Sequence, residues 1–98
     1  MMDLQEKHKK QLRKLGHALK PVVMVAGDGL KDTVIEATEE ALSFHELIIV
    51  KVRAETREDM KAIIEALCEK TGAQLITRTG FVALLFRRNT ESPKVIFD

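Results

Sequence analysis

The chain has 98 residues, the size of one ordinary domain, so a single hydrophobic core must account for the whole sequence. Hydrophobic residues make up 45% and charged residues 32%, which is typical of a folded globular protein and excludes a disordered chain. No apolar run reaches the roughly 18 residues of a membrane-spanning helix, and the polar N-terminus is unlike a signal peptide. We therefore expect a cytoplasmic protein that does not associate with membranes.

The net charge is only +1, but the charges are distributed unevenly along the chain. Residues 1–20 contain two acids, Asp3 and Glu6, and a larger set of bases, which are Lys7, Lys9, Lys10, Arg13, Lys14 and Lys20. Residues 32–46 contain acids and no Lys or Arg, whereas residues 70–88 contain bases and no acid. This distribution predicts a basic face, suited to a polyanion such as nucleic acid, and a separate acidic face.

The first expected element is an amphipathic helix from Asp3 to about Leu19, which Gly16 and Pro21 should bring to an end. A narrow apolar stripe, which we expect to be buried, consists of Leu4, His8, Leu12, Leu15 and Leu19. The six bases lie outside this stripe. They are therefore free to meet solvent or a polyanion.

A strand, a turn and a second helix should follow. Val22 to Val25 is a short apolar run typical of a buried strand, and Ala26-Gly27-Asp28-Gly29 is a strong turn signal. A helix from Asp32 to Phe44 should bury one side formed by Val34, Ile35, Thr38, Ala41 and Leu42. Its opposite side carries the acids Glu36, Glu39 and Glu40.

The second half predicts a strand, a helix and a hairpin. From Leu47 to Arg53, buried residues should alternate with Ile49, Lys51 and Arg53. Thr56 and Asp59 resemble a capping box that opens a helix ending at Gly72, with a buried stripe of Met60, Ile63, Ile64, Leu67 and Cys68.

The remaining residues complete an α/β fold. The segments 74–79 and 81–87 flank Gly80 and predict a β-hairpin. In the tail, residues 89–93 are expected to fray, although residues 95–97 could add an edge strand. The order α-β-α-β-α-β-β predicts one domain over residues 1–98, with about 89–98 as a flexible tail. Its architecture should be a single four-stranded sheet with helices on its faces.

Catalytic or metal-binding chemistry is not expected. The three histidines lack the spacing of metal ligands, and Cys68 has no second thiol, so neither a metal nor a cofactor is predicted. His8 and His45 fall on the buried stripes of their helices, and His17 is interpreted as a contact at a helix end. Since there is also no catalytic triad and no P-loop, we expect no enzyme and no small-molecule substrate.

The turn before the second helix could bind phosphate, because exposed amides meet the positive end of the helix dipole there. Such turns are common, so this signal is weak alone. The basic helix strengthens it, since a one-sided cluster of Lys and Arg often binds a polyphosphate backbone, although a merely solvated face stays open. Of the four phenylalanines, only Phe81 is placed to stack on a base, so binding should rely on backbone charge and shape.

Several short segments occur in a specific order and spacing. They are Leu19-Lys20-Pro21-Val22-Val23, Gly29-Leu30, His45-Glu46-Leu47-Ile48, Thr71-Gly72-Ala73 and Leu85-Phe86-Arg87. Together they resemble the CRM domain (chloroplast RNA splicing and ribosome maturation), particularly its stand-alone bacterial YhbY-like members. The resemblance covers nearly the whole chain. It implies a fold similar to the C-terminal domain of translation initiation factor three and a GxxG loop comparable in role to that of KH domains.

The resemblance also implies RNA binding and, for bacterial members, association with precursors of the large ribosomal subunit. The sequence departs from the family pattern in the loop, where Ala26 replaces the first glycine and Asp28 introduces a charge that should repel phosphate. Lys31 stands where Thr or Ser is common, which weakens the helix cap but adds a cation. Ile49 replaces a commonly basic residue on the strand.

Our leading hypothesis is a non-catalytic protein that binds large-subunit ribosomal RNA or its precursor particle and acts in ribosome assembly. The candidate RNA-binding residues are Lys7, Lys10, Arg13, Lys14, Lys20, Gly27, Asp28, Gly29, Lys31, Lys51 and Arg53. The alternative is a protein-interaction adaptor that docks a basic partner, such as a ribosomal protein, through the acidic second helix.

Overall fold

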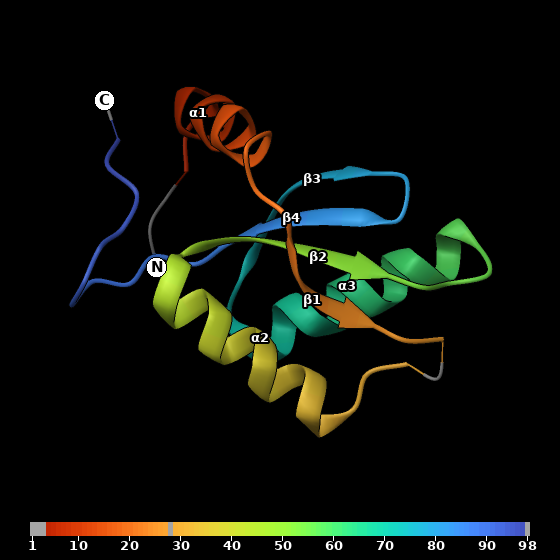
Figure 1. Cartoon of the computed structure of the whole chain (residues 1–98). Coiled ribbons are helices and arrows are strands. Elements are labelled where there is room, and N and C mark those ends of the chain that lie inside the picture. The colour runs from red at the N-terminus through yellow and green to blue at the C-terminus, as the bar shows by residue number, and fades with distance from the viewer. Residues whose placement is uncertain (1–3, 28, 98) are drawn as a thin grey trace.

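The structure, a computed structural model, describes residues 4–27 and 29–97, which form a four-stranded mixed sheet with helices on both faces (Figure 1). The helices are α1 (Glu6–Gly16), α2 (Asp32–His45) and α3 (Arg57–Thr71). The strands are β1 (Pro21–Val25), β2 (Leu47–Val52), β3 (Gln74–Thr79) and β4 (Val82–Phe86). The class, the element order and the hairpin around Gly80 confirm the predicted architecture.

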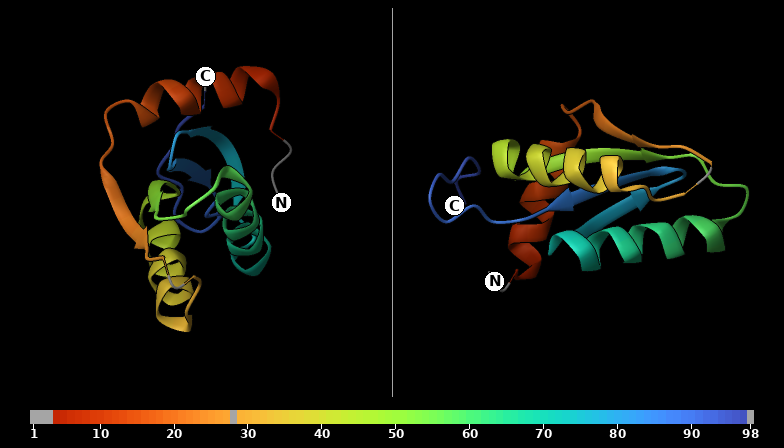
Figure 2. Two further views of the ribbon diagram at one scale, coloured as in Figure 1. Left: turned by 90° about the vertical axis from the view of Figure 1, so that its right-hand side faces the viewer. Right: turned by 90° about the horizontal axis from the view of Figure 1, so that it is seen from below.

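The strands are arranged in the order β1-β2-β4-β3, so β1 and β3 form the two edges of the sheet. β1 runs parallel to β2, whereas the β2–β4 and β3–β4 pairs are antiparallel. α2 and α3 lie along one face of the sheet, and α1 crosses the other face near one end (Figure 2). One face is therefore covered by two helices, while the other is covered only in part.

The main core lies between the sheet and the α2–α3 layer. In β2 the alternation predicted from the sequence is present, since Ile48, Val50 and Val52 are buried and Lys51 is exposed. These side chains meet the apolar stripes of α2 and α3, in a cluster that includes Val25, Leu42, Met60, Ile64, Leu67 and Leu85. The buried side chains that recur every two residues in the strand thus pack against apolar side chains that recur about every 3.6 residues in the helices.

α3 begins and ends where its sequence predicts. The Thr56 side chain accepts a hydrogen bond of 3.0 Å from the backbone N–H of Asp59, which caps the first turn. Gly72 follows the helix with φ +74°, a left-handed conformation that glycine adopts without steric cost. The helix is therefore fixed at both ends by local chemistry.

A second, smaller core lies between α1 and the other face of the sheet. Leu12 is fully buried there and belongs to a cluster with Leu47, Ile76, Leu84, Phe86 and Val95. Gly16 lets the helix approach the sheet closely, since a Cβ at this position would lie 2.8 Å from Cδ2 of Leu84. α1 is thus held mainly at Leu12 and Gly16.

α1 is shorter and less buried than the sequence predicts. The expected start at Asp3 lies outside the described residues, and the helix ends at Gly16, before Leu19. Leu15 and Leu19, expected in the buried stripe, are 43% and 39% exposed. A single helix that crosses a sheet buries only the residues along its line of contact, so the outer parts of an apolar stripe can remain in solvent.

Two other expectations about burial are wrong. β1 is an edge strand, so Val23 and Val25 are buried against α2 and α3 while Val22 and Met24 are exposed on the partly covered face. His45 is exposed at the end of α2. His8, by contrast, lies at the core edge as expected: it is half-buried, its Nδ1 accepts a hydrogen bond from the Gln5 N–H, and its ring centroid lies 4.9 Å from that of Phe97.

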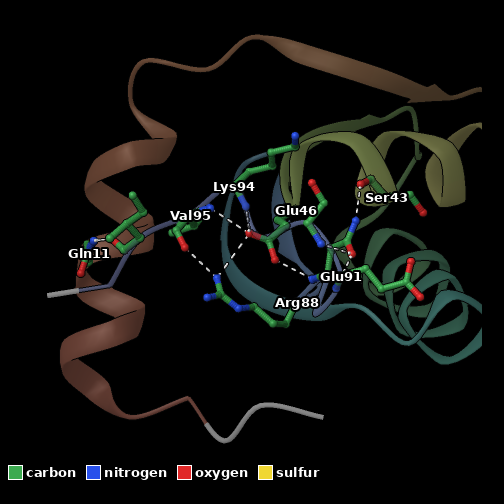
Figure 3. A network of polar contacts seen from close by, with 10 residues as sticks. Gln11, Ser43, Glu46, Arg88, Glu91, Lys94 and Val95 are labelled. Atoms are coloured by element: carbon green, nitrogen blue, oxygen red, sulfur yellow. Dashed lines mark hydrogen bonds and ion pairs between the residues drawn. The ribbon is translucent and has the colours of Figure 1, made fainter.

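The C-terminal tail is held by hydrogen bonds, where the sequence suggested fraying, and residues 95–97 form no strand. The backbone N–H groups of Asn89, Lys94 and Val95 donate to the carboxylate of Glu46 over 2.5, 2.6 and 2.8 Å. Arg88 donates to the same carboxylate and to the carbonyl of Val95. The tail passes between Glu46 and α1 (Figure 3), where Gln11 donates to the carbonyl oxygen of Ile96.

Glu46 is fully buried and has φ +62°, a strained value for a residue with a side chain. Burial alone would raise the pKa of its carboxyl group. The three backbone N–H donors and the nearby charge of Arg88 outweigh burial, so the pKa is lowered below its ordinary value. Glu46 is therefore ionised at neutral pH and acts as a charged acceptor for the tail.

Ile64→Ala is expected to lower the free energy of unfolding by about 2 to 5 kcal/mol, because Ile64 is buried in the main core. Urea denaturation followed by circular dichroism measures this change. Lys61→Ala, on the exposed side of the same helix, is the matched control and should shift stability by less than about 0.5 kcal/mol. Equal midpoints for the two variants would contradict the assignment of the core.

Glu46→Gln should destabilise the tail, because it removes the charge that accepts several hydrogen bonds in a buried site. Amide hydrogen exchange at Lys94 and Val95 should become much faster than in the parent protein. Because the pKa of Glu46 is lowered in the folded state from its ordinary value of about 4.5, the stabilisation is fully present above that pH and is lost as pH falls through the lowered value.

The control is Glu40→Gln, an exposed position on α2, the helix that ends just before Glu46, and its exchange rates should match those of the parent. In the parent protein, exchange at Lys94 and Val95, corrected for the intrinsic effect of pH, should accelerate on acidification. Glu46→Gln should lack this acceleration. Unchanged protection in Glu46→Gln at neutral pH would show that other contacts hold the tail.

Candidate functional site

The bases predicted on α1 form a solvent-facing surface. Lys7, Lys10 and Lys14 are exposed, and the structure gives none of them an ion pair within its described residues. They line a shallow depression along the helix, together with His8, Gln11, Arg13 and His17. Arg13 is half-buried and also lines a second hollow, between α1 and the sheet. We call Lys7, Lys10 and Lys14 the basic crest of α1.

The glycine loop lies at the carboxyl end of β1. The N–H of Gly29 donates to the carbonyl of Ala26 over 3.1 Å, which closes a tight turn, and Gly29 has φ +92°. Ala26 does not occupy the left-handed region, so this position does not require the glycine common in the resembling family. Asp28 lies outside the described residues, and Lys31 is the N-cap of α2 without a side-chain capping bond, as the sequence predicts.

Lys51 and Arg53 lie at the same end of the sheet as the glycine loop. Lys51 pairs with Met24 in the register between β1 and β2, and the Arg53 N–H donates to the carbonyl of Val25. Arg53 and Gly27 line one hollow, but Glu55 and Asp59 line it too. The acids offset part of the positive charge at this end.

The candidate residues therefore fall into two groups. One consists of the basic crest, Arg13 and Lys20, and the other of the glycine loop with Lys31, Lys51 and Arg53. β1 runs from the first group to the second (Figure 1), and its five residues span about 16 Å. The surface between them includes the exposed Met24, which lies beside Lys51 of the second group on the open part of the sheet. A ligand that contacts both groups must be extended.

Sequence reasoning missed residues that the sheet brings close to Arg13. Thr77 and Thr79 of β3 line the hollow between α1 and the sheet, with Arg13 and His17 on the helix side. The predicted role of His17 as a helix-end contact holds for its backbone, whose N–H donates to the carbonyl of Lys14. Thr77 and Thr79 are polar residues two positions apart in a strand, so their side chains lie on the same face of the sheet. This pattern in the sequence indicates a sheet face that is not fully covered.

Two bases of the stretch 70–88 serve the structure and are not available as a basic face. Arg87 donates to the carboxylate of Glu39 over 2.7 Å and to the carbonyl of Thr71 over 2.8 Å. Arg88 pairs with Glu46. Part of the acidic side of α2 serves the structure as well, since Glu39 forms an ion pair with Arg87. Glu36 and Glu40 remain exposed.

The other groups considered in the sequence have ordinary environments. Burial raises the pKa of the Cys68 thiol, which suits a structural side chain. Phe81 is 44% exposed as expected, but Phe44 on α2 is more exposed at 68%. In the described residues, no helix is long and apolar enough to cross a membrane, and no cluster of His, Cys, Asp and Glu could hold a metal.

Comparisons with known proteins agree with this fold. A family model of the CRS1/YhbY (CRM) domain matches residues 4–87. The probable RNA-binding protein PA4753 of Pseudomonas aeruginosa is 40% identical over 93 residues, which cover 95% of this chain and 89% of that protein. An RNA-binding protein of Haemophilus influenzae is 40% identical over 92 residues, covering 94% of this chain and 93% of that protein.

A solved structure has a similar fold. The solution structure of a Staphylococcus aureus protein, named as a candidate RNA-binding protein, has a TM-score of 0.83 and 27% identity. The match covers 98% of this chain and all of that one. With the family model spanning most of the chain, these matches establish that the protein belongs to the CRS1/YhbY (CRM) domain family.

Proposed function

We propose that this protein binds RNA through the basic crest of α1, Arg13, Lys20 and the glycine loop with Lys31, Lys51 and Arg53. The observation that carries the proposal is the basic crest itself, three exposed lysines on one helix without ion-pair partners in the described structure. Such a row of cations gains free energy from a polyphosphate backbone by releasing condensed counterions. The names of the two bacterial relatives support the same partner.

The proposed RNA is large-subunit ribosomal RNA, bound within a precursor particle during ribosome assembly in the cytoplasm. The protein would act there by binding and not by catalysis. Its surface suits an extended polyanion, because the two groups of candidate residues lie at opposite ends of β1. The glycine loop would let the RNA backbone approach the protein backbone closely. The space beside it is open, since a Cβ at Gly27 or Gly29 would meet nothing within 4 Å.

The adaptor hypothesis receives less support from the structure. Its acidic surface on α2 is partly neutralised, because Glu39 is bound by Arg87 within the same molecule. Only Glu36 and Glu40 remain of the three acids that were expected to dock a basic partner. Charge complementarity therefore favours RNA over a basic protein.

Sedimentation of cell extract with immunodetection of the protein tests the proposed partner. We expect co-migration with precursors of the large subunit and loss of that co-migration after RNase treatment. Association that resists RNase would favour the adaptor. Migration only at the top of the gradient would contradict both a ribosomal precursor and a stable protein partner.

The variant Lys7→Gln/Lys10→Gln/Lys14→Gln should bind RNA more weakly, because each lysine is expected to neutralise a phosphate. The slope of log affinity against log salt should flatten by about 0.7 to 0.9 for each phosphate that the variant no longer neutralises. Fluorescence anisotropy with a labelled RNA at several salt concentrations measures both quantities. Stability should change little, since all three side chains are exposed.

The matched control is Glu36→Gln/Glu40→Gln, which alters exposed charges on α2 and spares the Glu39–Arg87 pair. It should leave RNA affinity equal or slightly higher. A triple lysine variant with the parental affinity and salt slope would show that the basic crest is only a solvated helix face.

A further inference from the structure

The hollow between α1 and the open part of the sheet has the features of a small binding site. It has a volume of about 200 Å³ and is lined by Arg13, Gly16, His17, Ile49, Thr77, Thr79, Val82 and Leu84. Pockets for drug-sized molecules usually measure roughly 300 to 1,000 Å³, so this one suits a smaller group. We call it the α1–sheet pocket.

Sheet register explains how the α1–sheet pocket is built. Ile49 of β2 pairs with Leu84 of β4, and Leu84 pairs with Thr77 of β3, so these three side chains form a row across one face of the sheet. Val82 and Thr79 form the next row, with Lys51 beside Val82. The aliphatic side chains provide an apolar floor, and the two threonines of the edge strand β3 line one side of it.

α1 forms the other wall. Gly16 brings the helix backbone close to Leu84, and Arg13 and His17 precede and follow this contact at the rim of the pocket. Within the described residues, the side chains of Arg13, His17, Thr77 and Thr79 have no hydrogen-bond or ion-pair partner, whereas the fully buried polar side-chain atoms there all have one. Side chains with unused donors and acceptors thus line the same pocket as an apolar floor.

We propose that the α1–sheet pocket receives one unstacked base of single-stranded RNA. The proposal rests on the proposed function and specifies the kind of RNA that this surface recognises. A planar base can lie against Ile49, Val82 and Leu84, while the Thr77 and Thr79 hydroxyls, each able to donate and accept, pair with its polar edge. Protein recognition of RNA commonly uses bases splayed out of single strands in this way.

The charges around the pocket fit a nucleotide rather than a free anion. Phosphate would not be stabilised by the aliphatic floor, but it can lie at the rim, where Arg13 is placed to bind it or to stack on the base. Lys51, exposed on the adjoining row, can neutralise the next phosphate toward the glycine loop. The pocket therefore adjoins both groups of candidate residues, since Arg13 of the first group lines it and Lys51 of the second lies beside Val82.

The test compares Thr77→Val/Thr79→Val with the parent protein. Valine keeps the shape of threonine and favours strands, so the fold should be retained, which a thermal unfolding midpoint checks. Affinity for short oligoadenylate, oligocytidylate and oligouridylate should fall by roughly 2- to 10-fold for each hydroxyl that a given base uses. The salt slope should not change, because no charge is removed, and affinity for an RNA duplex should be unaffected.

The control is Thr90→Val, an exposed threonine in the tail. A second measurement on the parent protein follows the methyl resonances of Ile49, Val82 and Leu84, which should shift when oligonucleotide is added but not when duplex RNA is added. Unchanged single-strand affinity in the double variant together with unshifted methyl resonances would overturn the pocket. Failure of the parent protein to bind any RNA would instead overturn the proposed function. Methyl shifts caused only by a protein partner would overturn the pocket as a base site and assign it to a protein side chain.

Discussion

The carboxylate of Glu46 organises the end of the molecule at which α1 is held. It joins the end of α2, the start of β2 and a tail that returns more than 40 residues later in the chain. The tail then supplies Val95 to the small core beneath α1, the Ile96 carbonyl to Gln11 and the Phe97 ring to His8. α1 buries only a narrow line of side chains on the sheet. Its position, and with it that of the basic crest, therefore depends in part on the tail that this buried acid holds, in addition to the contacts of Leu12 and Gly16.

Three of the five segments that carry the family resemblance, which contain Glu46, Thr71 and Arg87, meet at this same end. Thr71 accepts from Arg87 through its carbonyl, and its hydroxyl donates to Leu67 and accepts from the Ala73 N–H. Arg87 also binds Glu39 of α2. These residues connect α2, α3, β3 and β4 at the end of the sheet away from the glycine loop. We infer that much of the motif preserves the scaffold, while the candidate RNA contacts lie on α1, β1 and the loop.

Local patterns predicted the elements but not how they lie in the sheet. The Thr56 cap, Gly72 and the alternation in β2 are encoded within a few residues, and each was found where expected. The exposure of Val22 and Met24 follows from the place of β1 at the edge, which is set by strand order and not by its own composition. Likewise, nothing in the sequence near Glu46 indicates that distant amides donate to its carboxylate. Arg13 and Thr77 line one pocket only because α1 packs on the sheet.

The proposed RNA surface lies on the side of α1 and the open part of the sheet. Amide chemical shifts of isotope-labelled protein, titrated with short single-stranded RNA, test this placement most directly. We expect the largest changes at Lys14, Lys20, Lys51 and Gly29 and around the α1–sheet pocket, with little change at Glu36 and Glu40 on α2. Changes concentrated on the exposed side of α2, with the basic crest unaffected, would contradict this placement of RNA.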